Sequence, residues 1–294
     1  MTTTIDVDEE IRATIGAGFV SLIEEREDWR EAHVSDVYGC DYATHARRTS
    51  EKKPVANREP QGALKMAMGN DYERYITRGL SAFFEAHGGE LERGERIAWN
   101  PTTGTVRRGL FDAGHDLADH GGPGAMREIP CAGCVHCSPQ PGEMIGHLDA
   151  TGQSTIDGGK TWLLEIKSTS LYGRLPSSLP WELKSGALKG VHYIEQAASY
   201  GTAIDAKRVG VIIADRESGN IAGPFWLDLD APPPAVDGIY DPTKGTLREQ
   251  TIARAKQMLE ATDPEAFPPD PKPRYSWQPE YCNLGDKCAC KALS

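Results

Sequence analysis

The chain has 294 residues, enough for one large domain or two small ones with a buried core. Its content of 39% hydrophobic and 26% charged residues is typical of globular proteins, and no apolar run reaches the roughly 20 residues of a membrane-spanning helix. The net charge of −11 argues against a protein that coats nucleic acid non-specifically, and the acidic start, MTTTIDVDEE, has no apolar signal core, which predicts a cytoplasmic protein with no membrane partner.

The N-terminal part of the chain predicts two helices separated by an irregular stretch. Residues 7–32 have apolar side chains at helical spacing, so we treat residues 1–35 as an N-terminal helical segment. The polar stretch that follows carries a basic strip at residues 47–65, which either guides a phosphate backbone or is a solvated loop. A second helix is predicted at residues 62–87, ending at Gly88.

The rest of the chain predicts strands and helices in mixed order. A hairpin over residues 91–112 precedes a Gly-, His- and Cys-rich insertion at about residues 113–143. The elements expected after it are the strands MIGHLDAT and TWLLEIKS, a helix at 191–204, the strands RVGVIIAD and FWLDLD, a helix at 245–262 and a proline-rich tail from 264 to 294. This order predicts a single domain over residues 36–294, an α/β fold with a mixed central sheet flanked by helices.

Charged residues in the two central strands indicate chemistry. Glu165 and Lys167 are two residues apart in a strand and therefore share a face, and Asp149 on the preceding strand can reach the same edge. Two carboxylates can hold Mg²⁺ or Mn²⁺, and the ammonium can stabilise charge on a phosphate. The alternative is a structural ion pair between Glu165 and Lys167 on a half-exposed strand.

Two helices carry residues that fit the same site. Glu73 lies four residues after Gly69 on the second predicted helix and could supply a further acidic ligand. Gln196 and Tyr200 lie four residues apart and therefore on one face of a later helix. Taken alone, each would be an ordinary solvated side chain.

In chain order, Gly69…Glu73, Gly146-x-x-Asp149, Glu165-Ile166-Lys167 and Gln196-x-x-x-Tyr200 resemble the PD-(D/E)xK nuclease superfamily. The resemblance covers residues 36–290 and is strongest to the RecB-like branch, which includes CRISPR-associated exonucleases. It implies a restriction-endonuclease-like core in which Asp149 and Glu165 bind metal and Lys167 is catalytic. It also implies that Gln196 and Tyr200 orient the site or contact DNA. The branch usually has histidine at the position of Glu73.

The cysteines indicate metal sites rather than disulfides, because six of the seven lie in two tight groups. Several members of the resembled branch carry an iron–sulfur cluster with one ligand near the N-terminus and three near the C-terminus. The resemblance implies a [4Fe–4S] cluster here on Cys40, Cys282, Cys288 and Cys290. The chain departs from the branch pattern at Pro279, which stands where a cysteine is expected. Zinc on the same four residues, or a lost cluster, are the alternatives.

A second cysteine group lies in the insertion. Cys131, Cys134 and Cys137 have the spacing of a zinc site whose fourth ligand would be a histidine, for which His115, His120 and His136 are candidates. The run is also similar to part of a ferredoxin-type cluster motif. Reduced surface cysteines are the remaining interpretation.

Three functions fit these patterns. The first is a metal-dependent DNA exonuclease acting on duplex ends or single strands, which the resemblance would place beside a helicase, a recombinase or CRISPR adaptation proteins. The second is a site-specific endonuclease of the same superfamily. The third is a non-catalytic DNA-binding adaptor on the same fold.

Overall fold

The computed structural model describes residues 33–34, 60–110, 140–155, 158–170, 176–178, 190–236 and 240–260. The helix predicted at residues 7–32, the tail and all seven cysteines lie outside these residues, so the predictions for them stay predictions. The described elements are helices α3 (Pro60–Ala86), α4 (Gly190–Ala203) and α5 (Leu247–Glu260), the short helix η3 (Pro242–Lys244), and strands β1 (Glu90–Trp99), β2 (Val106–Leu110), β3 (Met144–Gln153), β4 (Thr161–Thr169), β5 (Arg208–Asp215) and β6 (Ile221–Leu227).

The six strands form one mixed sheet in the order β2-β1-β3-β4-β5-β6. Only β4 and β5 run parallel among these pairs, and α4 forms the crossover that a parallel pair requires. The other neighbours are antiparallel. The fold is therefore α/β with a mixed sheet, as the sequence predicted.

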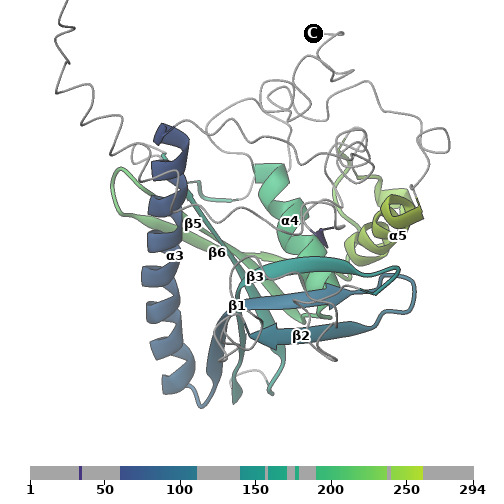
Figure 1. The fold of residues 1–294 in the computed structure, drawn as a ribbon, viewed down its shortest axis with the longest axis horizontal. Helices are drawn as coiled ribbons and strands as arrows, with labels where there is room; N and C mark the ends of the chain where they lie inside the picture. The colour runs from purple at the N-terminus through teal and green to yellow at the C-terminus, as the bar shows by residue number, and fades with distance from the viewer. Residues whose placement is uncertain are drawn as a thin grey trace, which may run out of the picture.

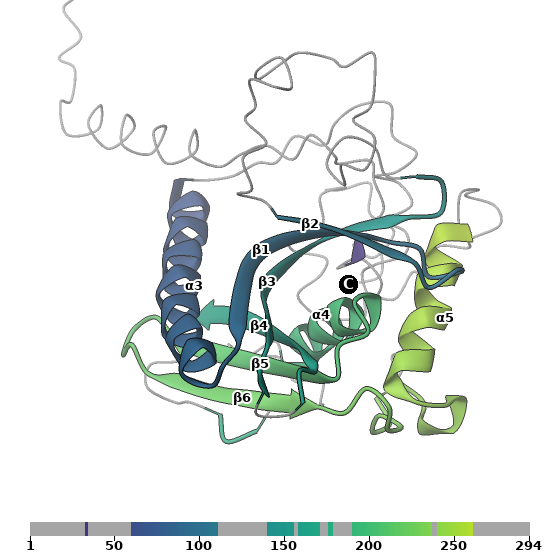
Figure 2. The same cartoon turned by 90° about the horizontal axis from the view of Figure 1, so that it is seen from below.

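Helices cover both faces of the sheet (Figures 1 and 2). Helix α3 packs on one face, where its Ile76 and Phe84 meet Leu164 and Ile166 of β4. Helices α4 and α5 lie on the other face, where the core includes Leu163, Ile194, Ala197, Val211 and Met258. The middle of β4 is thus buried on both sides, as is usual for a strand with a parallel neighbour. The alternative of a half-exposed strand at Glu165 is wrong.

The sheet divides in its middle. Pairing between β3 and β4 ends at Ala150–Leu164, whereas β3 stays paired with β1 as far as Trp99–Met144 and β4 stays paired with β5 as far as Thr169–Asp215. Figure 2 shows β1 and β3 curving away from β4 and over α4. We call this point, where Asp149 and Glu165 would have been the next pair, the fork.

A glycine marks the fork on the outer side of β3. Gly94 has a φ of 65°. It is missing from the β1–β3 register, which continues on both sides of it through Arg93–Ala150 and Glu95–Leu148. Only glycine adopts this left-handed conformation without strain. The kink therefore lies opposite Asp149 and bends β1 and β3 together.

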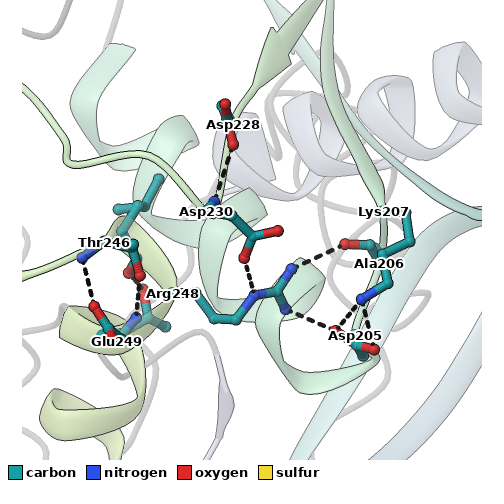
Figure 3. Close-up of polar contacts among 10 residues, drawn as sticks. Asp205, Ala206, Lys207, Asp228, Asp230, Thr246, Arg248 and Glu249 are labelled. Atoms are coloured by element: carbon teal, nitrogen blue, oxygen red, sulfur yellow. Dashed lines mark hydrogen bonds and ion pairs between the residues drawn. The ribbon is translucent and has the colours of Figure 1, made fainter.

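Helix α5 is fixed to the sheet by its first turn (Figure 3). Thr246 and Glu249 form a capping box, in which each backbone N–H donates to the other residue's side-chain oxygen at 3.2 and 2.7 Å. Arg248 donates to Asp230 at 2.7 Å and to the carbonyl oxygen of Ala206 at 3.2 Å, and it pairs with Asp205 at 3.2 Å. These contacts join the α4–β5 turn to α5.

The predicted elements differ from the structure mainly at their ends. The prediction placed the last strand in FWLDLD, but β6 begins at Ile221 and ends at Leu227. The last three predicted residues, Asp228 to Asp230, instead lead into the contact of Asp230 with Arg248. No helix among the described residues is both long and apolar enough to span a membrane.

Candidate active site

Asp149, Glu165 and Lys167 meet at the fork. Asp149 Oδ2 accepts a hydrogen bond of 2.7 Å from the backbone N–H of Ile166, a donor that lies just beyond the last β3–β4 pair. Lys167 Nζ donates to Glu165 Oε1 and lies 3.8 Å from Asp149 Oδ2. The division of the sheet thus makes room for three charged side chains between two strands that would otherwise be joined by backbone hydrogen bonds.

Glu165 is the most constrained of the three. Its side chain is fully buried, and its Oε2 atom has no hydrogen-bond partner among the described residues. Burial, together with the nearby charge of Asp149, raises the pKa of Glu165 to about 8, although Lys167 opposes the shift. A buried carboxylate oxygen without a donor is costly and rare in native proteins, so it points to a missing ligand.

Lys167 balances this negative charge. Burial alone would lower the pKa of its ammonium, but the charges of Glu165 and Asp149 outweigh that effect and the pKa of Lys167 is raised. The side chain is therefore charged throughout the physiological pH range. Lys167 therefore interacts with two carboxyl groups, and Glu73 adds a third carboxyl group nearby.

Glu73 approaches the fork from α3. The helix comes close to β4 at Gly69, where a Cβ atom would lie 3.3 Å from Ser168 Oγ. Glu73 follows one turn later. Burial and then Asp149 raise the pKa of Glu73 to about 7, and Lys167 is among the cations that oppose the shift. Glu73 thus lies within electrostatic range of Asp149 and Lys167, and its role as a metal ligand stays a prediction.

Helix α4 closes the site from the other face. Tyr200 is buried, with 4% of its surface exposed, and its ring covers Gly146, where a Cβ would lie 2.9 Å from Cε1. Tyr200 is also close enough to Lys167 to affect its pKa. Gln196 lies one turn earlier and is half-buried. The alternative of a solvated surface residue is therefore wrong for Tyr200.

Tyr193 was not predicted from the sequence as a site residue. It lies one turn before Gln196 on the same side of α4 and is buried. A hydrogen bond with the Thr169 side chain and the charge of Lys167 both act on its hydroxyl, but burial dominates and raises its pKa. The spacing of Tyr193, Gln196 and Tyr200, at intervals of three and four residues, was the signal that could have found it.

The donor set fits a hard divalent cation. Mg²⁺ is usually held by one or two carboxylates, with water and substrate oxygens filling the remaining positions. Asp149 and Glu165 supply those carboxylates, and the unpartnered Oε2 of Glu165 supplies a free acceptor atom. In the described part of the chain, no three His, Cys, Asp or Glu side chains are drawn together as a complete cage. Glu73 is thus near the pair rather than part of a preformed triad.

Comparison with known proteins adds no family. No family model matches the chain, and no curated protein matches it. Among solved structures, it is similar to the crystal structure of SSO0001, with a TM-score of 0.45 and 16% sequence identity over 97% of each chain. At that level of likeness we infer nothing about function from it.

Proposed function

We propose that the protein is a metal-dependent nuclease that hydrolyses phosphodiester bonds of DNA, acting on ends or single strands. The observation that carries the proposal is Glu165, a fully buried side chain beside Asp149 and Lys167 whose Oε2 atom has no hydrogen-bond partner among the described residues. A carboxyl group with a purely structural role would have a donor for each oxygen and enough cations nearby to balance the acids. A bound metal ion would give the Oε2 atom of Glu165 a partner and would balance the charge of the acids.

In this proposal Asp149 and Glu165 hold Mg²⁺ or Mn²⁺ on opposite sides of the fork. When bound, the metal would neutralise phosphate charge and increase the acidity of a water molecule. Because Asp149 also accepts from the Ile166 N–H, its position is fixed by the backbone of β4. Placement on two strands rather than on loops gives the ligands the rigidity that catalysis needs.

Lys167 would hold the phosphate and the attacking water. Its raised pKa keeps the ammonium protonated, so it acts as an electrostatic stabiliser and not as a general base at neutral pH. Its present contacts with Glu165 and Asp149 place Nζ between the two proposed ligands, ready to turn to a phosphate oxygen. Tyr200 and Tyr193 on α4 would restrict where the lysine can move.

The order of residues around the fork also agrees with the resemblance to PD-(D/E)xK nucleases, and the proposal includes a restriction-endonuclease-like core. The Gln196-x-x-x-Tyr200 element favours the exonuclease branch over a site-specific endonuclease. The cost of burying Glu165 with no hydrogen-bond partner for Oε2 among the described residues disfavours a non-catalytic adaptor, because binding DNA alone does not require that cost.

Digestion of end-labelled linear DNA and of closed circular DNA, with and without Mn²⁺, tests the proposal. An exonuclease releases label from linear DNA only, and an endonuclease also opens the circle. Lys167→Ala should abolish either activity. Because the sequence also predicts metal sites on its cysteines, the reaction is compared with Cys40→Ser protein. Absence of metal-dependent cleavage of both substrates would contradict the proposal.

A further inference from the structure

Aromatic side chains gather at a second place on the same sheet, outside the fork. Trp162 of β4 and Trp226 of β6 are perpendicular, with ring centroids 5.3 Å apart. The Arg208 guanidinium lies 5.0 Å from the centroid of Trp162 and 5.6 Å from that of Trp226. Phe83 of α3 completes the group at 6.4 Å from Trp162. We call Phe83, Trp162, Arg208 and Trp226 the aromatic platform.

Glycine makes this arrangement possible. Gly210 of β5 is the register partner of Trp226. A Cβ there would lie 3.0 Å from Cζ3 of that indole and 3.1 Å from the Leu164 side chain. The bare backbone lets Trp226 lean across β5 toward Trp162. The ring is therefore held in one orientation by the strand that it crosses.

Three of the four side chains of the aromatic platform are exposed to solvent. Trp226 has 45% and Phe83 has 38% of its surface exposed, and Arg208 is exposed as well, whereas Trp162 beneath them is buried. Exposed tryptophan and phenylalanine cost solvation free energy that a surface residue of another type would not. Rigid aromatic faces next to an arginine are the elements by which proteins stack unpaired nucleic-acid bases.

We propose that the aromatic platform binds the bases of a single-stranded nucleic acid whose backbone continues to the fork, an inference that rests on the proposed nuclease function. Trp162 precedes Glu165 by three positions, about 10 Å along β4, and packs on the α3 side of the sheet, the side from which Glu73 approaches the fork. Phe83 follows Glu73 by ten helical positions, about 15 Å. These separations correspond to about three or four stacked nucleotides. The platform would hold a strand a few nucleotides away from the bond that is cut.

The negative net charge of the protein favours bases rather than phosphates as the main contact of the aromatic platform. With a net charge of −11, the protein has little general attraction for a polyanion, so affinity for DNA has to come from another source. Stacking on aromatic rings is tolerant of sequence and does not require a basic surface. The Arg208 guanidinium, 5.0 and 5.6 Å from the two indole centroids, supplies one cation where a phosphate would pass.

Binding of oligothymidylate to Lys167→Ala protein without divalent metal tests the platform separately from cleavage. We expect tryptophan fluorescence to be quenched by a strand of about 20 nucleotides, and Trp226→Ala to weaken binding by about 5- to 100-fold. Trp226→Ala should leave the slope of log affinity against log salt unchanged, because it removes no charge. Arg208→Gln should reduce that slope by about one unit.

Matched controls come from the same elements. Ile221 on β6 and Tyr75 on α3 are also exposed, at 56% and 69%, and neither belongs to the platform. Ile221→Ala and Tyr75→Ala should bind oligothymidylate as the parent protein does. Trp226→Phe should retain most of the affinity, because a smaller aromatic face remains, and this variant guards against a folding defect.

Cleavage then separates the two proposals. In metal-competent protein, Trp226→Ala should raise KM for strands of about 20 nucleotides, with kcat unchanged, and should not change the kinetics on a strand of about three nucleotides. Failure of the wild-type protein to cleave any DNA would count against the nuclease alone. Unchanged oligothymidylate affinity in both Trp226→Ala and Arg208→Gln would overturn the platform, even in an active nuclease.

Discussion

Two buried glutamates on strands either side of β3 have opposite surroundings. Glu95 of β1 is 3% exposed, and both of its oxygens accept hydrogen bonds of 2.5 Å from Arg108, with a third bond of 3.1 Å from Thr151. Glu165 of β4 is fully buried, with Lys167 on one oxygen and no partner for the other among the described residues. The same side chain is thus satisfied at one position and left incomplete at the other.

The difference separates a structural role from a functional one. Arg108 is a planar, bidentate partner that completes the hydrogen bonding of Glu95, and the hydrogen bond to Glu95 raises the pKa of that arginine. Glu165 is paired instead with the ammonium of Lys167, which offers no planar pair of donors, and two further acids, Asp149 and Glu73, lie nearby. Burial without compensation destabilises the fold, so it persists where binding or catalysis requires it.

The largest expected effect is a loss of DNA cleavage when Glu165 is substituted. Glu165→Gln keeps the shape of the side chain but removes the charge that would hold the metal, so cleavage should fall by about 100- to 1,000-fold or more. Glu95→Gln should retain cleavage within about threefold, because Glu95 faces Arg108 and Thr151 rather than the fork. Initial rates on end-labelled DNA measure both, and equal losses would remove the distinction.

The free energy of unfolding should depend more on Glu95 than on Glu165, the reverse of the order expected for cleavage. Glu95→Ala leaves Arg108 and Thr151 without their acceptor and should lower the free energy of unfolding by about 1–3 kcal/mol. With its pKa raised to about 8, Glu165 is mostly protonated at neutral pH in metal-free protein, so the neutral Glu165→Gln side chain should cost less than about 1 kcal/mol. Urea denaturation measures both. A greater loss in Glu165→Gln would mean that Glu165 is the structural residue of the two.

The main elements could be predicted from sequence because their apolar patterns are strong. Helix α3, the strands β3 and β4, and helix α4 were predicted close to their observed bounds, and Asp149, Glu165 and Lys167 are brought together as expected. Glu73 could be paired with them only as a guess, because the packing of α3 on the sheet depends on contacts remote in sequence, such as that of Gly69 with Ser168.

Other features could not be read from the chain. The full burial of Glu165 depends on α4 crossing over to a parallel partner strand, which an alternating strand pattern does not reveal. The kink opposite the fork is at Gly94, and a glycine between Arg93 and Glu95 does not indicate a left-handed φ. The Glu95–Arg108 pair depends on the β1–β2 register, which places the arginine beside Ile97.

A smaller effect is expected at Glu73. Its carboxylate is coupled to Asp149 and Lys167 but comes from a helix outside the strand pair. Glu73→Gln should slow cleavage by about tenfold and raise the Mn²⁺ concentration needed for half-maximal rate. Glu85→Gln, on the exposed side of the same helix, serves as the control. An unchanged Mn²⁺ titration in Glu73→Gln would show that this acid is only a neighbour of the site.

The smallest effect is expected at Tyr193, which positions the end of β4 rather than contacting the reacting groups. Tyr193→Phe removes the hydroxyl that interacts with Thr169 and should lower kcat by only about two- to fivefold, with KM unchanged. Thr169→Val removes the other partner and should have a similar effect, and the double variant should be no worse than either. Additive losses would show that the two hydroxyls act separately.

Binding of Mn²⁺ measured by calorimetry tests the contrast between the two glutamates most directly. Mn²⁺ is chosen because it prefers oxygen ligands over thiolates, so cysteine sites outside the described residues contribute little. Our expectation is that wild-type and Glu95→Gln proteins bind Mn²⁺ with the same affinity and that Glu165→Gln loses the site, weakening binding by at least about tenfold. Equal Mn²⁺ binding by wild-type and Glu165→Gln proteins, or its loss in Glu95→Gln, would contradict it.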